Sequence, residues 1–294
     1  MNTIAQATPP NIGAESDSKP VMRSVPIVLE PTTSLIPVNL GDLWAYRELL
    51  YFLIWRDLKV RYKQTMLGAA WVVMQPLAMA LVFTVFLGHF ARVPSAGIPY
   101  LLLVFSGLVP WMFFSSAVVS SGNSVVGSAH LITKVYFPRL IVPLGAIAGR
   151  LVDFAISFLV LAGLMYYYGV SLSWKLLALP VFVLLLTGLA FGVGTLAAAW
   201  NVKYRDVSIL LPVIIQLWMF SSPVVYPVDV VPARWRQLYI LNPLTGLIDG
   251  FRSVLLNRKV DLAAVLISSL ITIVLFVFAL FVFRRMEKDF ADVV

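Results

Sequence analysis

RDVSILLPVIIQLWMFSSPVVYPVDVVPARWRQLYILNPLTGLIDGFR, residues 205–252, is the stretch of the chain that decides its fold. Residues 207–225 are apolar apart from one glutamine and three serines, and about 20 such residues cross the hydrocarbon core of a bilayer. Prolines at positions 223, 227, 232 and 243 then prevent one continuous helix, although the sequence stays rich in Val, Tyr, Trp, Leu and Ile. Irregular backbone at membrane depth persists only where protein covers it or where it lines a cavity, because lipid offers no hydrogen bonds. The stretch therefore predicts a membrane span followed by a segment that closes over a pore.

The composition of the whole chain indicates an integral membrane protein. Of the 294 residues, 60% are hydrophobic and 12% are charged, and the mean hydropathy is +0.91. Soluble domains carry about a quarter charged residues. The formal net charge of +8 favours contact with an anionic lipid leaflet or an anionic substrate. Because the basic residues are spread between apolar runs, the sequence argues against a nucleic-acid partner.

Hydropathy and length predict an all-α protein with six membrane spans. Besides residues 207–225, the predicted spans are Leu67–Leu87, Ile98–Ser120, Ile141–Tyr168, Leu176–Trp200 and Leu262–Phe283. Residues 1–40 hold six of the 18 prolines and show no apolar periodicity, which predicts a disordered tail. We therefore divide the chain into the tail (1–40), an amphipathic helix (41–64) and a transmembrane domain (65–294).

The distribution of basic residues predicts that both termini are cytoplasmic. Seven Lys or Arg precede the first span and three follow the last, and such residues concentrate on the cytoplasmic side. On this topology seven basic residues fall outside, and five of them follow Val225. The membrane depth of residues 226–258 therefore stays open.

The predicted helix at residues 41–64 has one aromatic and one basic face. Five large side chains recur at helical spacing: Trp44, Tyr51, Trp55, Leu58 and Tyr62. Three basic residues fall on a neighbouring face: Arg56, Lys59 and Lys63. This pattern predicts a helix in the membrane–water interface, and the alternative is a cytoplasmic helix packed on protein.

Arg150 and Asp153 form the one charged pair inside a predicted span. Charged side chains within a membrane usually face the bundle interior or a water-filled path. We therefore expect the pair to line a translocation path or to face a partner subunit. In the alternative, Arg150 reaches toward the cytoplasmic surface and Asp153 only neutralises it.

Three aromatic residues lead into the proline-rich segment: Trp218, Phe220 and Tyr226. Aromatic rings stack on the C–H faces of sugars, so these residues are candidates for lining a carbohydrate path. The alternative is that they pack the protein interior or anchor it at the membrane interface.

The sequence predicts no catalytic residues and no metal site. It has no cysteine, and its two histidines, His89 and His130, lie 41 residues apart. The motifs G-x-S-x-G, H-E-x-x-H and G-x-x-x-x-G-K-[ST] are absent. We therefore expect a non-enzymatic chain that binds no cofactor, so that any nucleotide site belongs to another polypeptide.

Several short motifs, in this order, resemble those of the polysaccharide-exporting ABC-2 permeases. They are WRDLKVRYKQTMLGAAWVVMQPL (55–77), KVYFPRLIVPL (134–144), YRD (204–206), SPVVYP (222–227), NPL (242–244) and FR (251–252). The resemblance covers about residues 40–285. It implies a multi-pass protein of the bacterial inner membrane that moves O-antigen, capsule or teichoic-acid chains.

The resemblance also implies partners and contact residues. The permease would dimerise and pair with two copies of a separate ATPase, which uses ATP and Mg²⁺. Residues 123–139, hereafter the coupling segment, would dock into this ATPase, with candidate contacts at His130, Lys134, Phe137, Pro138 and Arg139. Short re-entrant helices between spans five and six would cap the outer mouth.

The family's substrate is anchored to a polyprenyl diphosphate lipid, which implies a diphosphate contact for Arg56, Lys59 and Lys63. Contact with anionic lipid headgroups is the alternative for these residues. Two other functions stay open at this point. One is an ABC-2 exporter of drugs or lipids, and the other is a channel or membrane enzyme that works alone.

Overall fold

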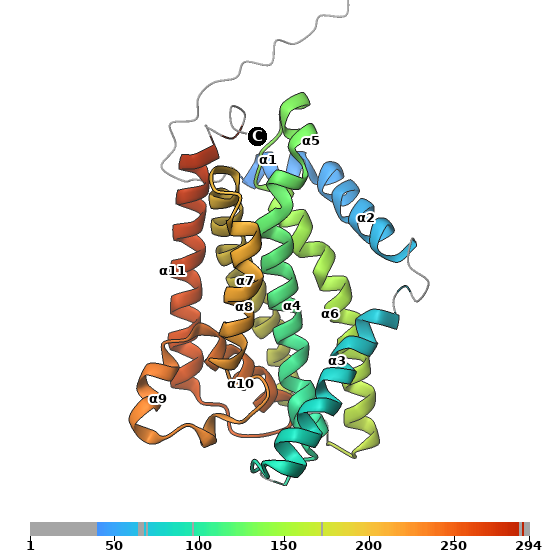
Figure 1. The fold of residues 1–294 in the computed structure, drawn as a ribbon, viewed down its shortest axis with the longest axis vertical. Coiled ribbons are helices and arrows are strands. Elements are labelled where there is room, and N and C mark those ends of the chain that lie inside the picture. Colours follow the sequence, from blue (N-terminus) through green and yellow to red (C-terminus); the bar gives the residue numbers. More distant parts are fainter. Residues whose placement is uncertain are drawn as a thin grey trace, which may run out of the picture. The chain divides into compact units, whose positions relative to one another are not determined.

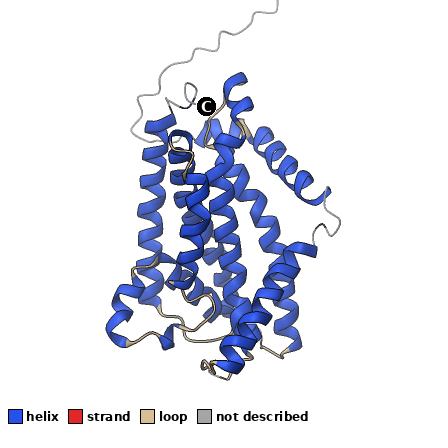
Figure 2. Cartoon of the chain, in the orientation of Figure 1, coloured by secondary structure: helices blue, strands red, loops and turns tan. Residues whose placement is uncertain are grey.

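The structure is a computed structural model that describes residues 40–63, 68, 70–95, 97–171, 173–287 and 290. Within these ranges every regular element is a helix and no strand occurs, which confirms the all-α class (Figure 2). The α-helices are α1 (Leu40–Ala45), α2 (Arg47–Lys63), α3 (Ala70–Phe83), α4 (Tyr100–Gly127), α5 (Ala129–Lys134), α6 (Ile141–Tyr167), α7 (Leu179–Lys203), α8 (Val207–Phe220), α9 (Ala233–Ile240), α10 (Pro243–Leu255) and α11 (Leu262–Glu287). A π-helix, η1 (Thr84–Phe90), continues α3, and two 3₁₀ helices, η2 (Trp174–Ala178) and η3 (Val228–Val230), complete the described elements. Residues 1–39 of the predicted tail lie outside the described residues.

Five of the six predicted spans are confirmed by helices of sufficient length and hydropathy. They are Ala70–Phe90, Tyr100–Gly127, Ile141–Tyr167, Trp174–Lys203 and Leu262–Glu287. The sixth, α8, has 14 residues, which at 1.5 Å per residue gives about 21 Å against a hydrocarbon core of about 30 Å. It ends at Phe220 and not at Val225, because Ser221 and Ser222 form a turn before Pro223, which has no N–H for a helical bond.

Helix α4 is the centre of the bundle. In its most apolar 18-residue window 78% of the residues are buried, against 11% for Ala70–Phe90 and 17% for α11. Helix α4 packs on α6 and α7, and α11 packs on the other side of α7 (Figure 1). The peripheral helices thus keep their apolar side chains on the outside, as expected for helices that face lipid.

The connections between helices gather at two ends of the bundle. Helix α5, the turn between α7 and α8 and the C-terminal end of α11 lie at one end (Figure 1). The π-helix η1 follows α3 to the opposite end, where α9 and α10 lie. The first and last described helices therefore reach the same end of the bundle.

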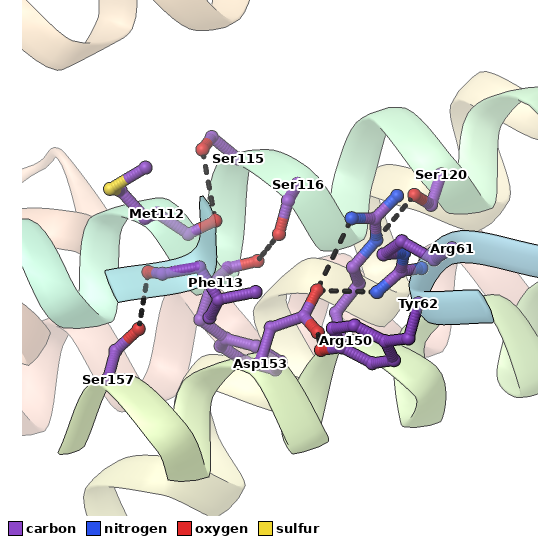
Figure 3. Close-up of polar contacts among 11 residues, drawn as sticks. Arg61, Tyr62, Met112, Phe113, Ser115, Ser116, Ser120, Arg150, Asp153 and Ser157 are labelled. Carbon is purple, nitrogen blue, oxygen red and sulfur yellow. Dashed lines mark hydrogen bonds and ion pairs between the residues drawn. The ribbon is translucent and has the colours of Figure 1, made fainter. Parts of the chain in front are cut away.

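The predicted amphipathic helix is divided at Tyr46 into α1 and α2. Helix α2 packs on α6, where Leu53 is buried. The aromatic face is also divided, because Trp44 and Trp55 are exposed whereas Tyr62 turns inward (Figure 3). Helix α2 thus has one side on protein and an aromatic side that is free for lipid.

Candidate functional site

A cluster of charged side chains joins the C-terminal end of α2 to α6 (Figure 3). The Asp153 carboxylate on α6 accepts hydrogen bonds from the Arg61 guanidinium and from the Tyr62 hydroxyl, both on α2. One helical turn before Asp153, the Arg150 Nη1 lies 3.4 Å from the same carboxylate, and its Nε donates to Ser120 Oγ on α4 at 2.8 Å. We call Arg61, Tyr62, Arg150 and Asp153 the ionic cluster. Asp153 joins α2 to α6, and Arg150 extends the cluster to α4 through Ser120.

The ionic cluster carries more positive than negative charge. Two guanidinium groups face one carboxylate, and the exposed fractions are 25% for the Arg61 side chain, 26% for Arg150 and 16% for Asp153. Burial, together with the neighbouring Asp153, raises the pKa of Tyr62 to about 12, so its hydroxyl stays a hydrogen-bond donor at neutral pH. One carboxylate neutralises only part of the positive charge of the two guanidinium groups. The cluster can therefore donate charge-assisted hydrogen bonds to an anion that reaches it.

Two cavities adjoin the ionic cluster. The smaller, of about 220 Å³, lies between α2, α3, α4 and α6 and includes Trp71, Gln75 and Phe113 in its lining. The larger, of about 540 Å³, is bordered by one acidic residue, Asp57, and by three arginines and polar side chains of α4 and its end: Arg56, Arg61, Arg150, Ser120, Asn123, Ser124 and Ser128. Guanidinium, hydroxyl and amide donors in one cavity suit a ligand that is rich in anionic oxygen atoms.

The predicted headgroup contacts are only partly brought together. Arg56 borders the larger cavity and also pairs with its neighbour Asp57 at 3.1 Å. Lys59 and Lys63 are exposed and border neither cavity. Arg61, which sequence reasoning left out as a headgroup contact, also borders this cavity. Residues five apart do not share a face of a helix, so the spacing alone does not predict this.

The segment after α8, residues 221–227, is held by hydrogen bonds and not by regular structure. We call it the turn segment. Arg252 on α10 is fully buried and donates from Nη2 to the Val224 carbonyl at 2.6 Å and from Nη1 to the Tyr226 carbonyl at 3.4 Å. The Tyr100 hydroxyl donates to the carbonyl between them, that of Val225, at 3.0 Å. Three consecutive carbonyls therefore receive side-chain donors, as buried backbone requires.

A glycine makes room for this arrangement. A Cβ atom at Gly107 on α4 would lie 2.1 Å from the Val224 carbonyl oxygen and 2.2 Å from Arg252 Nη2. Real side chains do not approach this closely, so the turn segment and Arg252 can occupy this place only because residue 107 has no side chain.

Asn242 fixes the start of α10 and the end of α8 together. Its Oδ1 accepts from the Leu244 N–H at 3.1 Å, as an N-cap does, and from Trp218 Nε1 at 3.0 Å. Its Nδ2 donates to the Ser221 carbonyl at 2.8 Å and to Ser222 Oγ at 2.9 Å. Sequence reasoning missed this role, although an asparagine directly before a proline is a typical helix start.

The structure places the three predicted path-lining aromatics around the turn segment. Trp218 is held by Asn242 and packs edge-on against Phe114, with ring centroids 5.4 Å apart. The Tyr226 hydroxyl donates to the Phe220 carbonyl at 2.8 Å and lies 3.0 Å from the Tyr239 hydroxyl. The Phe220 ring is 55% exposed. The polar groups of Trp218 and Tyr226 thus bind protein, whereas the Phe220 ring is left without a covering neighbour over about half of its surface.

The coupling segment presents some of its predicted contact residues and buries others. His130 and Lys134 are exposed on α5, whereas Phe137 is only 4% exposed and belongs to the core. Pro138 is half-buried, and Arg139 bonds to Glu287 at the end of α11. Tyr136, which sequence reasoning left out, is 76% exposed beside them. His130, Lys134 and Tyr136 therefore belong to the outward surface, together with the exposed Thr133 and Val135, and Phe137 holds this surface on the bundle.

The amino-acid sequence matches the profile of the ABC-2 type transporter family over residues 48–256. It is 30% identical over 258 residues to the O-antigen export system permease protein RfbA of Klebsiella pneumoniae, which covers 87% of this chain and 97% of that protein. RfbA of Myxococcus xanthus is 27% identical over 85% of this chain and 97% of its own length. The polysialic acid transport protein KpsM of Escherichia coli is 21% identical over 68% of this chain and 78% of that protein.

Proposed function

Because the chain belongs to the ABC-2 type transporter family, we propose that it is the permease subunit of an ABC transporter that exports a lipid-linked polysaccharide across the bacterial inner membrane. The observation that carries this proposal is the match to an O-antigen export permease over 87% of this chain and 97% of that protein. The substrate belongs to the O-antigen, capsule or teichoic-acid class. The chain itself catalyses no reaction, and a partner ATPase hydrolyses ATP with Mg²⁺.

The proposed assembly is two copies of this chain with two copies of the ATPase, since a pore between identical faces suits a closed two-fold dimer. Both termini and α5 face the cytoplasm in this proposal, which the basic residues at the two ends of the chain favour. Helix α8 is the sixth span, shortened because the turn segment and α10 complete the passage as re-entrant structure. Helix α2 lies in the interface, with its exposed aromatic side toward lipid.

We assign the substrate's diphosphate to the larger cavity. Arg56, Arg61 and Arg150 border it together with hydroxyl and amide donors, and these three guanidinium groups outnumber the one carboxylate there, that of Asp57. Paired phosphates bind such donors well. Lys59 and Lys63, which are exposed and do not border this cavity, contact anionic lipid headgroups. Phe220 at the exposed end of α8 contacts the glycan in the path between the two copies.

The proposed mechanism is mechanical. ATP-driven closure of the ATPase subunits pushes on the coupling segment and on α2. The spans of the two permease copies then separate or tighten around the glycan. The outward surface of His130, Lys134 and Tyr136 is the part of the coupling segment that receives this push.

The test of the function is the material that accumulates when the chain is deleted from its cell. We expect lipid-linked glycan to collect at the inner leaflet, and we expect an ATPase with the G-x-x-x-x-G-K-[ST] motif to co-purify with the tagged chain. Accumulation of a small hydrophobic compound would instead assign the chain to the drug or lipid exporters. Purification without any nucleotide-binding partner would favour a channel or enzyme that works alone.

The exposed and buried halves of the coupling segment predict different mutant phenotypes. Lys134→Glu reverses an exposed charge, so we expect weaker association with the ATPase and lower export at unchanged thermal stability. Phe137→Ala removes a buried ring and should lower the free energy of unfolding by about 3 kcal/mol. Co-purification of the ATPase and thermal unfolding of the detergent-solubilised chain measure the two effects.

Arg236→Glu is the matched control for Lys134→Glu. It reverses an exposed charge on α9, at the opposite end of the bundle from α5. Normal ATPase association is expected for this variant. Equal loss of association in both variants would mean that overall charge, and not the α5 surface, governs docking.

A further inference from the structure

The coupling segment is bonded to the C-terminal end of α11 by two hydrogen bonds, both donated by Arg139. The Arg139 backbone N–H donates to Glu287 Oε1 at 3.2 Å, and the Arg139 guanidinium donates to the Glu287 carbonyl oxygen. The last carbonyls of a helix have no partner within the helix, so Arg139 supplies a donor that α11 itself lacks. Two bonds between the same two residues resist both sliding and rotation of the coupling segment against α11.

Aromatic packing supports the same junction. The Arg139 guanidinium lies 5.9 Å from the ring centroid of Phe290, which is 1% exposed. The Phe290 ring in turn packs edge-on against Phe283 of α11, with the centroids 5.2 Å apart. Because Phe283 is fully buried, the junction is anchored in the core and not only at the surface.

The opposite half of α11 is joined equally closely to α10. The Gly246 backbone N–H donates to Ser268 Oγ at 3.2 Å, and Ser268 is fully buried. A Cβ atom at Gly246 would lie 2.3 Å from the Ala264 carbonyl oxygen, so the two backbones are in direct contact. Helix α10 carries Arg252, which holds the turn segment. A continuous chain of contacts, part-buried at Glu287 and fully buried at Ser268, therefore runs from the coupling segment through α11 and α10 to the turn segment.

We propose that α11 transmits displacements from the coupling segment to the turn segment, and that Glu287 is the positioning residue that attaches α11 to the coupling segment. A displacement of the coupling segment by the ATPase then moves α11 along its axis, and α10 moves the turn segment with it. Helix α11 has 26 residues, so it spans about 39 Å as a rigid, internally bonded element. The inference rests on the proposed function only in taking the coupling segment as the place where the ATPase pushes.

The test compares three variants and one matched control in the assembled complex with its ATPase. Glu287→Ala removes the Oε1 that accepts from Arg139, and Ser268→Ala removes the acceptor at the α10 end. For both we expect normal assembly and normal ATPase activity, but export lower by about tenfold. A loss of this size is typical of substitutions that weaken the coupling between two sites. Glu287→Gln keeps an acceptor oxygen, so its export should stay close to that of the unmodified chain. Arg285→Gln, an exposed charge change two residues from Glu287, is the matched control and should export normally.

The double variant Glu287→Ala/Ser268→Ala decides whether both residues act on one route. If α11 carries the displacement, the second substitution adds little to the loss of export caused by the first. Fully additive losses, or normal export in both single variants, would overturn the proposal. Loss of ATPase association in Glu287→Ala and Glu287→Gln alike would also overturn it, because Glu287 would then be a docking charge. Failure of the unmodified chain to assemble with any ATPase would instead refute the proposed function.

Discussion

Replacing Arg252 with leucine is expected to release the turn segment and abolish export. The substitution removes a fully buried guanidinium and leaves the Val224 and Tyr226 carbonyls without their donors. Each carbonyl that loses its donor costs about 1–3 kcal/mol, so the free energy of unfolding should fall by about 2–6 kcal/mol in total. Thermal unfolding of the detergent-solubilised chain measures the loss. Because the sequence has no cysteine, a single Val231→Cys label reports whether the residues beside the turn segment become reactive.

Two further variants separate the buried arginine from a general effect of charge. Arg258→Ala removes a neighbouring arginine whose partner Asp229 is 73% exposed, and we expect it to change stability by less than about 1 kcal/mol. Arg252→Lys keeps the charge but offers one donor group in place of a fork, so it should fall between the leucine variant and the unmodified chain. If Arg252→Leu unfolds at the temperature of the unmodified chain, the turn segment is held by Tyr100 and Asn242 alone.

Asp153→Asn is the second substitution with a large expected effect. The carboxylate accepts from Arg61, Tyr62 and Arg150, and the amide would leave two guanidinium groups facing each other without a counter-charge. We expect a loss of about 2–3 kcal/mol, less than for a fully buried pair, because Arg61 and Arg150 keep 25% and 26% of their side chains exposed. The end of α2 should separate from α6. Thermal unfolding and proteolysis within residues 47–63 measure these two effects.

A double-mutant cycle tests whether the destabilisation comes from the unpaired arginines. Arg150→Leu should be less harmful in the Asp153→Asn background than in the unmodified chain, since it then removes a repulsion and not an attraction. Asp57→Asn is the matched control, because Asp57 pairs with the exposed Arg56 and contributes little. Independent, additive effects of the Asp153 and Arg150 substitutions would contradict the claim that the ionic cluster holds the end of α2 on α6.

The membrane spans could be predicted from the sequence because their signal is local. Long apolar runs gave α4, α6, α7 and α11 within a few residues, although α4 continues seven residues past the predicted Ser120. The end of α8 was predicted too late, since the apolar residues continue through Val225 while the serines and Pro223 stop the helix. The π-helix at Thr84–Phe90 could not be predicted from the sequence, because an apolar run is compatible with an α-helix and with a π-helix.

The site was predictable only where its partners are close in sequence. Arg150 and Asp153 lie three residues apart and were found by that spacing. Arg61 lies 92 residues from Asp153, and only the packing of α2 on α6 brings them together. Arg252 was noted as part of a motif, but its targets are backbone carbonyls, which carry no residue-specific signal. The predicted family, in contrast, is confirmed over residues 48–256, because many weak motifs in a fixed order are specific together.

Gly107 couples the evolution of α4 to that of α10, because it makes room for Arg252. Any larger residue there would occupy the place of Arg252 Nη2 and the Val224 oxygen. A relative with a larger residue at position 107 must also have replaced the arginine at position 252. Replacing the arginine alone leaves an empty space beside the glycine. Comparing relatives position by position should find glycine at 107 wherever arginine stands at 252, and exchanges at the two places arriving together.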